Sequence, residues 1–214
     1  TFTVRDFSGR PLKRRQEIRD TAVSGLQNST VRLQMTLPQK QPGVLLGMAV
    51  GLTSAVALIV IGGTINPFGF STAMDLPSRM SIAIESSVML AIFLVASVGR
   101  LARHRFFTPE DIDAGAAQGG SDRAKILQSL LQNTLEQTVI AIMVYMAWAA
   151  TMPAQWLSVV PMAAILFSLG RALFFVGYEK GAPYRALGFA LGFYSSVGML
   201  VCVIGHVLHR FFSA

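Results

Sequence analysis

Cysteine and charged residues are scarce in this sequence. Cys202 is the only cysteine among 214 residues, which excludes an internal disulfide and any metal site built from several thiolates. Charged residues make up 14% of the chain and hydrophobic residues 52%, and the mean hydropathy is +0.52. A soluble fold could not keep so much apolar surface away from water, so the composition indicates an integral membrane protein.

Acidic residues are the scarcer of the two charge types, and the formal net charge is +7. In a soluble protein this excess would suggest a nucleic-acid partner. Here the basic residues cluster beside apolar segments, which is the pattern that membrane topology produces. We therefore expect membrane lipids, and no nucleic acid, as partners.

The apolar segments predict five membrane crossings in an all-α integral membrane protein. The first has 22 uncharged residues, enough to cross about 30 Å of hydrocarbon at 1.5 Å per residue. The chain divides into a basic arm, residues 1–42, an extra transmembrane helix, residues 43–66, and a four-helix membrane domain, residues 80–210. The expected helices cover residues 44–65, 80–101, 124–150, 156–178 and 185–209.

Three features outside the four-helix domain leave alternatives open. Residues 30–37, TVRLQMTL, alternate apolar and polar side chains, as a half-buried strand or a loop would. Gly43, Gly47 and Gly51 repeat at four-residue spacing, which either permits close approach of another helix or reflects how common glycine is in membrane helices. Asn28 begins a glycosylation sequon that we expect to be unused, because it precedes the first crossing.

The distribution of basic residues predicts the orientation. Fifteen Lys and Arg lie in the arm, in the stretch 100–125 and in the turn 178–185, whereas only Arg79 and Arg210 lie on the other side. The positive-inside rule then places the amino terminus in the cytoplasm and the carboxyl terminus outside, in a multi-pass protein of the bacterial inner membrane. Trp148 and Trp156 are predicted to lie together at the outer interface.

Polar residues enter the predicted third helix and form a stripe along one of its faces: Gln128, Ser129, Gln132, Asn133, Glu136 and Gln137. Lipid offers no hydrogen-bond partner, so this face must meet protein, ligand or water. An ionisable residue within a span indicates function by default. The structural alternative is that Glu136 pairs with Arg171 of the next helix.

Arg171, Phe174 and Tyr178 follow one another along one face of the fourth predicted helix, and Arg185 lies just beyond the turn. Together with the arginines that end the second predicted helix, they form a cationic rim at the cytoplasmic membrane boundary. A small anionic ligand would suit this rim. The alternative for the arginines at 100, 103 and 105 is contact with lipid headgroups.

The segments LLQNTLEQ and GRALFFVGY, with Arg185 seven residues after Tyr178, resemble the MAPEG family, membrane-associated proteins in eicosanoid and glutathione metabolism. The resemblance covers roughly residues 82–210. It implies a four-helix membrane unit that forms a homotrimer and binds glutathione between subunits near the cytosolic boundary. The extra first helix and the arm lie outside it.

The resemblance also assigns roles to residues. Asn133 and Glu136 match positions that hold the backbone and amino group of glutathione, and Tyr178 matches a ligand-contacting tyrosine. Arg171 and Arg185 match arginines of the site, and Arg100 or Arg103 corresponds to the arginine that ends the family's first helix. A guanidinium beside the sulfur favours the reactive thiolate, for which Arg185 and Arg103 are the catalytic candidates.

Three positions depart from the family's pattern: Ser129, Phe174 and Gln137. The first hypothesis is a glutathione-dependent transferase or peroxidase that acts on a lipophilic electrophile from the bilayer. The second, which the departures motivate, is a catalytically silent scaffold or accessory subunit of a membrane complex, docked through residues 1–66. A transporter has little support, because the sequence has no internal repeat.

Two smaller signals complete the sequence. His206 and His209 could share a metal ion, but no third ligand accompanies them, so we expect no metal site. Thr108 followed by Pro109 predicts the start of a short helix.

Overall fold

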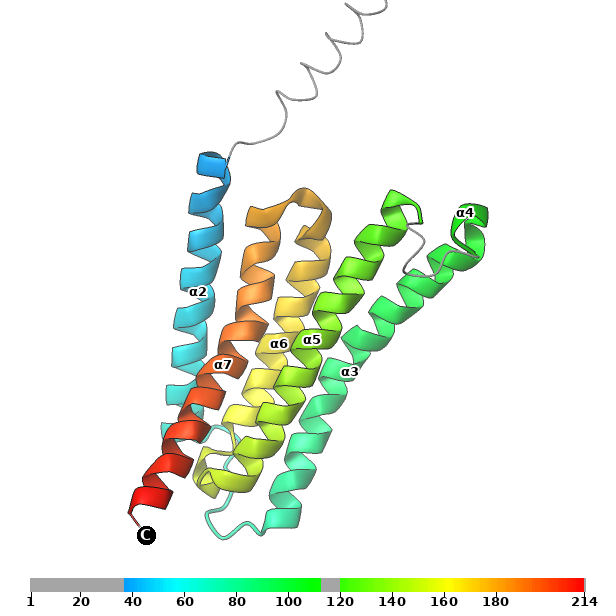
Figure 1. The fold of residues 1–214 in the computed structure, drawn as a ribbon. Coiled ribbons are helices and arrows are strands. Elements are labelled where there is room, and N and C mark those ends of the chain that lie inside the picture. The colour runs from blue at the N-terminus through cyan, green and yellow to red at the C-terminus, as the bar shows by residue number, and fades with distance from the viewer. Residues whose placement is uncertain (1–36, 113–119, 214) are drawn as a thin grey trace, which may run out of the picture. The chain divides into compact units, whose positions relative to one another are not determined.

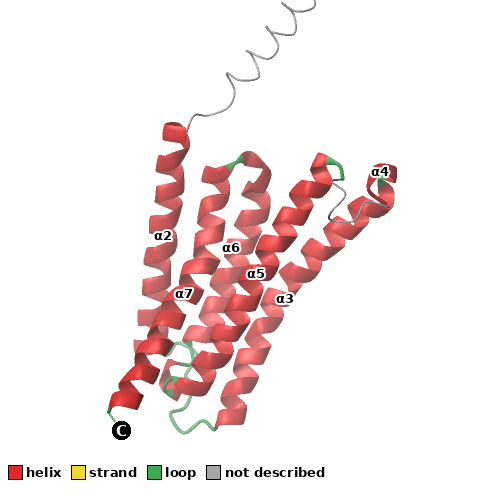
Figure 2. Ribbon diagram, viewed as in Figure 1, coloured by secondary structure: helices red, strands yellow, loops and turns green. Residues whose placement is uncertain are grey.

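The structure is a computed structural model that describes residues 37–112 and 120–213. The chain divides into two units, residues 1–40 and 41–214, and the account below concerns the second. The segment 30–36 and Asn28 lie outside the described residues. Within those residues every regular element is helical, which confirms the predicted all-α membrane class (Figure 2).

Five long helices follow one another in the described residues (Figure 1). A short helix follows the second of them, and two 3₁₀ turns flank the fourth. The elements are α2 (Leu37–Thr64), α3 (Leu76–Phe107), α4 (Pro109–Ile112), α5 (Asp122–Thr151), η1 (Ala154–Trp156), α6 (Val159–Gly177), η2 (Tyr178–Lys180) and α7 (Ala182–Phe212).

Four of the described helical segments are long and apolar enough to cross a membrane: Gln41–Thr64, Leu76–Phe107, Ala154–Lys180 and Ala182–Phe212. Helix α5 has 30 residues but is not among them, because its first half carries the polar stripe. It packs against α3 on one side and α7 on the other. Part of the stripe therefore meets protein rather than lipid.

The helix ends explain why the spans predicted for α3, α5 and α7 were too short. Asp75 caps α3 by accepting a hydrogen bond from the Ser78 N–H at 3.2 Å, and Ser121 caps α5 in the same way through Ala124. Helix α3 continues six residues beyond the predicted end at 101, so Arg103 and Arg105 are helical. Hydropathy detects the edge of the hydrocarbon, whereas backbone hydrogen bonding continues past it. The short helix predicted from Pro109 is confirmed as α4.

The glycine repeat of α2 is a helix-packing surface against α7, which lies beside it in Figure 1. A Cβ at Gly47 would lie 2.8 Å from the backbone N of Leu187, and one at Gly51 would meet Ala190 more closely still. The same face continues through the buried Ala55 and Leu58. The close-approach interpretation is thus confirmed, and only glycine allows this separation.

The two tryptophans lie together, as predicted, but not in the predicted surroundings. The Trp148 indole N–H donates to the carbonyl of Trp156 at 2.9 Å, and their ring centroids are 6.3 Å apart. Trp148 is fully buried in the main hydrophobic core rather than facing the interface. The hydrogen bond satisfies the indole inside the protein, so the ring needs no contact with headgroups.

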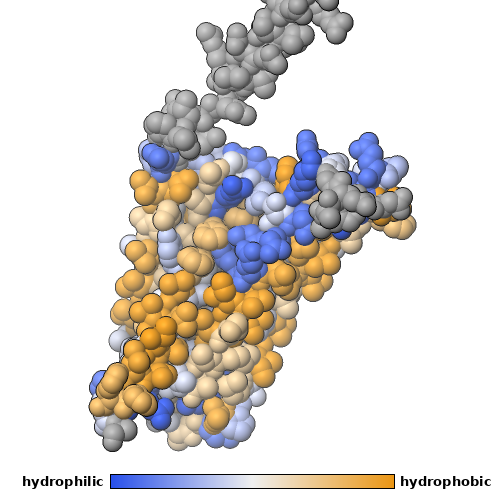
Figure 3. Space-filling view, in the orientation of Figure 1, coloured by the Kyte–Doolittle hydropathy of each residue, from blue (hydrophilic) through white to orange (hydrophobic). Residues whose placement is uncertain are grey.

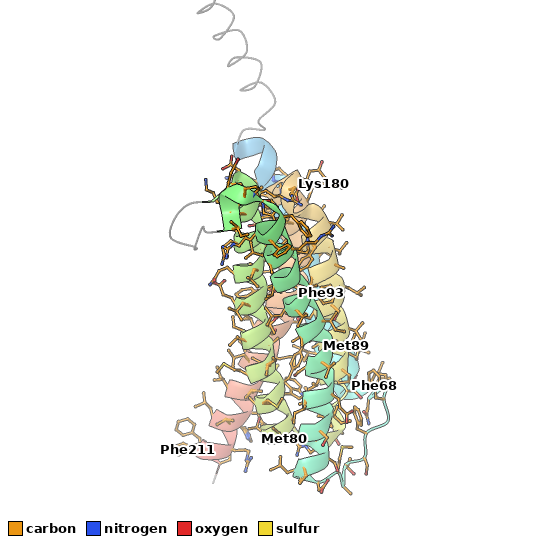
Figure 4. The ribbon with its side chains drawn as sticks, turned by 90° about the vertical axis from the view of Figure 1, so that its right-hand side faces the viewer. Phe68, Met80, Met89, Phe93, Lys180 and Phe211 are labelled. Carbon is orange, nitrogen blue, oxygen red and sulfur yellow. The ribbon has the colours of Figure 1, made fainter. Side chains whose placement is uncertain are left out.

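Basic residues gather at one end of the bundle, where α3 and α6 end and α5 and α7 begin; we call this the basic end. Figure 4 shows Lys180 at this end and Phe211 at the other. The opposite end holds the loop between α2 and α3. There Asn66, at a φ of 47°, accepts a hydrogen bond at 2.6 Å from the buried Ser158 hydroxyl.

Replacement of Gly47 by leucine should push α2 away from α7, because the added side chain has backbone atoms of α7 in its path. We expect a loss of about 1–3 kcal/mol in the free energy of unfolding, as overpacking typically costs. Thermal unfolding in detergent would measure it. Ala49→Leu, on the exposed face of the same helix, is the control, and equal melting temperatures for the two variants would contradict this packing.

Candidate functional site

A pocket of about 700 Å³ lies near the basic end and receives residues from α2, α5, α6, η2 and α7. One side is polar and comes mainly from α5. The other side comes from α2 and α7 and is mostly apolar, apart from Arg185 and the Tyr194 hydroxyl. Its lining residues are Val44, Met48, Gln128, Ser129, Gln132, Asn133, Glu136, Phe174, Tyr178, Ala182, Arg185, Ala186, Phe189 and Tyr194.

The polar stripe predicted on α5 is the polar wall of this pocket. Five of its six members line the pocket, and the sixth, Gln137, is buried behind it. Figure 3 shows a hydrophilic area over the half of α5 nearest the basic end, bordered by hydrophobic surface. Glu136 and Gln132 are both exposed there, and the Gln132 amide donates to the Glu136 carboxylate at 2.8 Å.

Arg171 does not pair with Glu136, so the predicted structural alternative for this pair is wrong. Its guanidinium is fully buried and donates to the side-chain oxygens of Asn133 and Gln137, both at 2.9 Å. Asn133 and Gln137 are four residues apart, hence on the same face of α5, while Glu136 is turned about 100° from Gln137. Two amide oxygens therefore take the place expected for a carboxylate.

Arg171 stands behind the pocket rather than in its lining. It lies against the Phe174 ring, 4.4 Å from its centroid, and a third, longer contact reaches the carbonyl of Gly188 at 3.5 Å. The Gln137 amide in turn donates to the Phe189 carbonyl at 3.4 Å. These contacts join α5, α6 and α7, so Arg171 positions Asn133. A direct ligand contact for Arg171 stays a prediction.

The predicted face of α6 does reach the pocket. Phe174 and Tyr178 both line it and meet edge to face, with ring centroids 5.2 Å apart. The guanidinium of Arg185, from the first turn of α7, lies 4.9 Å from the centroid of the Tyr178 ring. The three side chains form a stack that holds one positive charge, from α7, in the pocket.

Arg100 and Arg103 lie elsewhere. They line a second pocket of about 400 Å³, formed with His104, Phe107, Thr108, Arg123 and Leu127. None of these residues borders the first pocket. Arg100 lies over the Phe175 ring, 5.5 Å from its centroid, and Arg123 pairs with Glu179. Within a single chain, then, the predicted site residues other than Arg171 divide between two pockets.

A small polar network closes the basic end beside the second pocket. The buried Asp111 accepts hydrogen bonds at 2.6 Å from the Ser121 N–H at Oδ1 and from the Ser121 hydroxyl at Oδ2, and the His104 Nε2 lies 3.0 Å from the same Oδ2. Hydrogen bonds from Ser121, and to a lesser extent His104, lower the pKa of Asp111 below its ordinary value. This network ties the start of α5 to α4 and to the end of α3.

The family model of the MAPEG family matches residues 82–205, more than half of the chain and every long helix after α2. The chain belongs to the MAPEG family. A protein of Synechocystis sp. named "Uncharacterized protein sll1147" is 34% identical over 130 residues, which cover 57% of this chain and 80% of that protein. No solved structure matches the chain.

Membership makes this a multi-pass membrane protein of a family in glutathione and eicosanoid metabolism. Members of the MAPEG family use glutathione and are commonly trimers. The match begins at residue 82, so α2 lies outside it. Among the described residues, no group of three or more His, Cys, Asp or Glu is placed to hold a metal ion.

Sequence reasoning missed the apolar half of the pocket. Val44, Met48, Phe189 and Tyr194 line it, yet none of them belongs to a polar pattern. An apolar residue on a membrane helix has the same appearance whether it faces lipid, core or a ligand. The glycine repeat of α2 was the one signal that could have indicated this wall, because it indicates a packed helix.

Replacement of Gln137 by leucine should destabilise the bundle by about 1–3 kcal/mol, because one donor of the buried Arg171 would lose its acceptor. Unfolding by increasing sodium dodecyl sulfate, followed by circular dichroism, would measure the change. Gln132→Leu is the matched control, since Gln132 is exposed and does not touch Arg171. Equal midpoints for the two variants would show that Arg171 does not depend on Gln137.

Proposed function

We propose that this protein is a glutathione-dependent transferase that conjugates lipophilic electrophiles arriving from the bilayer. The supporting observation is the composition of the larger pocket, which holds one guanidinium, Arg185, and one carboxylate, Glu136, among neutral amides. Glutathione carries two carboxylates, one ammonium group and peptide groups. This set offers a carboxylate for the ammonium group, a guanidinium for one anionic group and amides for the peptide groups.

Each polar side chain has a role in this proposal. Glu136 accepts from the ammonium group, and Arg185 donates to an anionic group of the tripeptide. Asn133, held by Arg171, presents its amide N–H groups to the peptide part. Because the Arg171 contact fixes the amide orientation, the pocket is ordered before glutathione binds, and less conformational entropy is lost on binding.

Arg185 also suits the chemical step. A free thiol has a pKa near 8.5, so a guanidinium beside the sulfur raises the fraction of thiolate at neutral pH. The thiolate forms a sulfur–carbon bond with the electrophile, the leaving group departs with its electron pair, and the thiol proton passes to solvent. With a lipid hydroperoxide in place of the electrophile, two glutathione thiols would reduce the oxygen–oxygen bond and leave a disulfide, an alcohol and water.

The exposed polar wall supports assembly as a homotrimer. Glu136 lies 14 residues into α5, roughly 21 Å from its first residue and at membrane depth. A carboxylate left there against lipid would be costly, so a second copy or a ligand must cover it. Arg100 and Arg103 lie on α3, away from this pocket. A head-to-tail ring would bring the α3 arginines of one copy to the Glu136 pocket of the next.

The proposed orientation follows the charges at the basic end. Arg103, Arg123, Lys180 and Arg185 lie there, whereas Arg210 lies in the last turn of α7 at the opposite end. We propose that the basic end faces the cytoplasm of a bacterium, in its inner membrane, with residues 1–42 as a cytoplasmic arm. Cytoplasmic glutathione would then reach the pocket directly.

A second function is supported by two side chains of the pocket. Ser129 and Phe174 line it. They stand where the family resemblance implies an arginine and an aromatic hydroxyl. Without these polar contacts, the protein would be a catalytically silent member that serves as a scaffold or accessory subunit. A measurement of glutathione binding would distinguish the transferase from the scaffold.

Glu136→Gln should weaken glutathione binding about tenfold or more, because a charge-assisted hydrogen bond to the ammonium group is lost. Isothermal calorimetry on the purified, detergent-solubilised protein would measure the dissociation constant. Glu85→Gln is the matched control, because Glu85 is an exposed carboxylate of α3 outside both pockets. Absence of binding by the wild-type protein at millimolar glutathione would contradict the transferase and leave the scaffold.

Co-expression of Glu136→Gln and Arg103→Ala chains should restore part of the activity that each variant lacks alone. In a head-to-tail ring, a site formed by the Glu136 of one variant and the Arg103 of the other is intact. Random mixing yields roughly a quarter of the sites in this form. Conjugation of glutathione by the purified mixed trimer would measure it. Activity no higher than that of either variant would show that sites are not shared between copies.

A further inference from the structure

Helix α2 lies before the residues that match the MAPEG family, yet two of its side chains, Val44 and Met48, line the pocket. We propose that α2 is the wall that holds the lipophilic co-substrate, and that Val44 and Met48 determine which lipophilic molecules fit. This inference rests on the proposed function for its reaction. Binding of a lipophilic molecule to this wall can be tested without that reaction.

Glutathione would occupy the polar side of the pocket but has no use for the apolar side. The polar wall, on α5, suits a charged tripeptide. The side formed by α2 and α7 carries Val44, Met48, Ala182, Ala186 and Phe189, which offer neither charge nor side-chain hydrogen bonds. Arg185, on the same face of α7, is the charge at its edge. The free energy of the system falls when apolar surface of this kind is removed from water, for example by contact with an apolar ligand. The two halves together suit a polar thiol and an apolar partner held side by side.

The position of α2 is set by its glycines, not by the two lining side chains. Gly43 and Gly47 contact Pro183 and Leu187 of α7, and each lining residue follows one of these glycines directly. One residue turns a helix by about 100°, so Val44 and Met48 point to the side of the α7 contact, where the pocket lies. A larger residue at either glycine would displace the wall.

Met48 gives this wall a connection to the bilayer. Its side chain lines the pocket and is 40% exposed, and the α2 residues three positions before it and one after it, Leu45 and Ala49, are exposed and border neither pocket. Leu45, one turn before Met48 on the same side of α2, is 62% exposed, so an exposed apolar surface adjoins the pocket wall. A flexible thioether can take different rotamers for ligands of different width. A lipophilic molecule could therefore pass beside Met48 without crossing water.

Two substitutions would fill the wall, and two would serve as controls. Val44→Trp and Met48→Trp place a large ring in the apolar half of the pocket. Leu45→Trp and Ala49→Trp add the same ring one residue further along α2, where the side chains are exposed and line no pocket. Val44→Ala and Met48→Ala enlarge the pocket instead and avoid a steric effect on folding. Gel filtration would show that each variant keeps the wild-type assembly.

The first measurement is equilibrium binding of a fluorescent fatty-acid analogue to the detergent-solubilised protein, without glutathione. We expect the tryptophan variants at 44 and 48 to weaken binding about tenfold, the size of effect that an altered apolar pocket produces, and both controls to bind as the wild type does. Binding equal in all four tryptophan variants would overturn the proposal. This measurement stands even if the wild-type protein binds no glutathione.

The second measurement uses the addition of glutathione to α,β-unsaturated aldehydes of increasing chain length, in which the thiolate bonds to the β-carbon, the α-carbon takes up a proton and no group leaves. The alanine variants should shift the preference toward longer chains, seen as a severalfold change in the ratio of kcat/KM values, while the dissociation constant of glutathione stays unchanged. An unchanged chain-length preference would overturn the proposal. So would a parallel loss of glutathione affinity, because it would mean that α2 shapes the whole pocket rather than its apolar half.

Discussion

Burial of the Arg171 guanidinium is the constraint on which the rest of the site depends. A cation at membrane depth needs acceptors within the protein, and both terminal nitrogens of Arg171 have them, whereas its buried Nε has none among the described residues. Here Asn133 and Gln137 supply the acceptors from α5, and Gly188 adds a weaker one from α7. Because these groups come from three helices, the arrangement of α5, α6 and α7 is coupled to the protonated arginine.

The side chains that bind this buried arginine are neutral amides rather than a carboxylate. A buried ion pair would have used Glu136, which instead remains exposed on the pocket side of α5. The carboxylate is therefore left available, while the buried charge is held by groups that carry none. The same side chain, Asn133, both accepts from Arg171 and lines the pocket. Asn133 thus has two roles: its amide oxygen holds the buried Arg171, and its amide N–H groups are available to the proposed ligand.

The added helix changes the pocket in a way that the family match does not include. Glycines let α2 approach α7 so closely that its neighbouring residues reach a pocket otherwise formed by the four-helix unit. A helix with bulky residues at those positions would have stayed farther away, and the pocket would have been open on that side. Helix α2 can therefore form this wall because the glycines at its contact with α7 have no side chains.

Several features could be predicted from the sequence because they depend on local patterns. Long apolar segments determine membrane helices, spacing of three to four residues determines which polar groups share a face of α5, and the two motifs indicated the family. The partner of Arg171 could not be predicted, since Glu136 and Gln137 are neighbours in sequence and only helix rotation decides which of them faces α6. Burial of Trp148 escaped prediction for the same reason.

The sequence alone determined the class of protein, the helices and the set of polar residues at membrane depth, because hydropathy and helical periodicity are properties of a segment. Only the tertiary structure decided that Arg171 lies behind the pocket, that Arg100 and Arg103 lie at another one, and that Val44 and Met48 belong to the first. These are relations between helices far apart in the chain. They follow from side-chain volume and close packing at each contact, which no single segment contains.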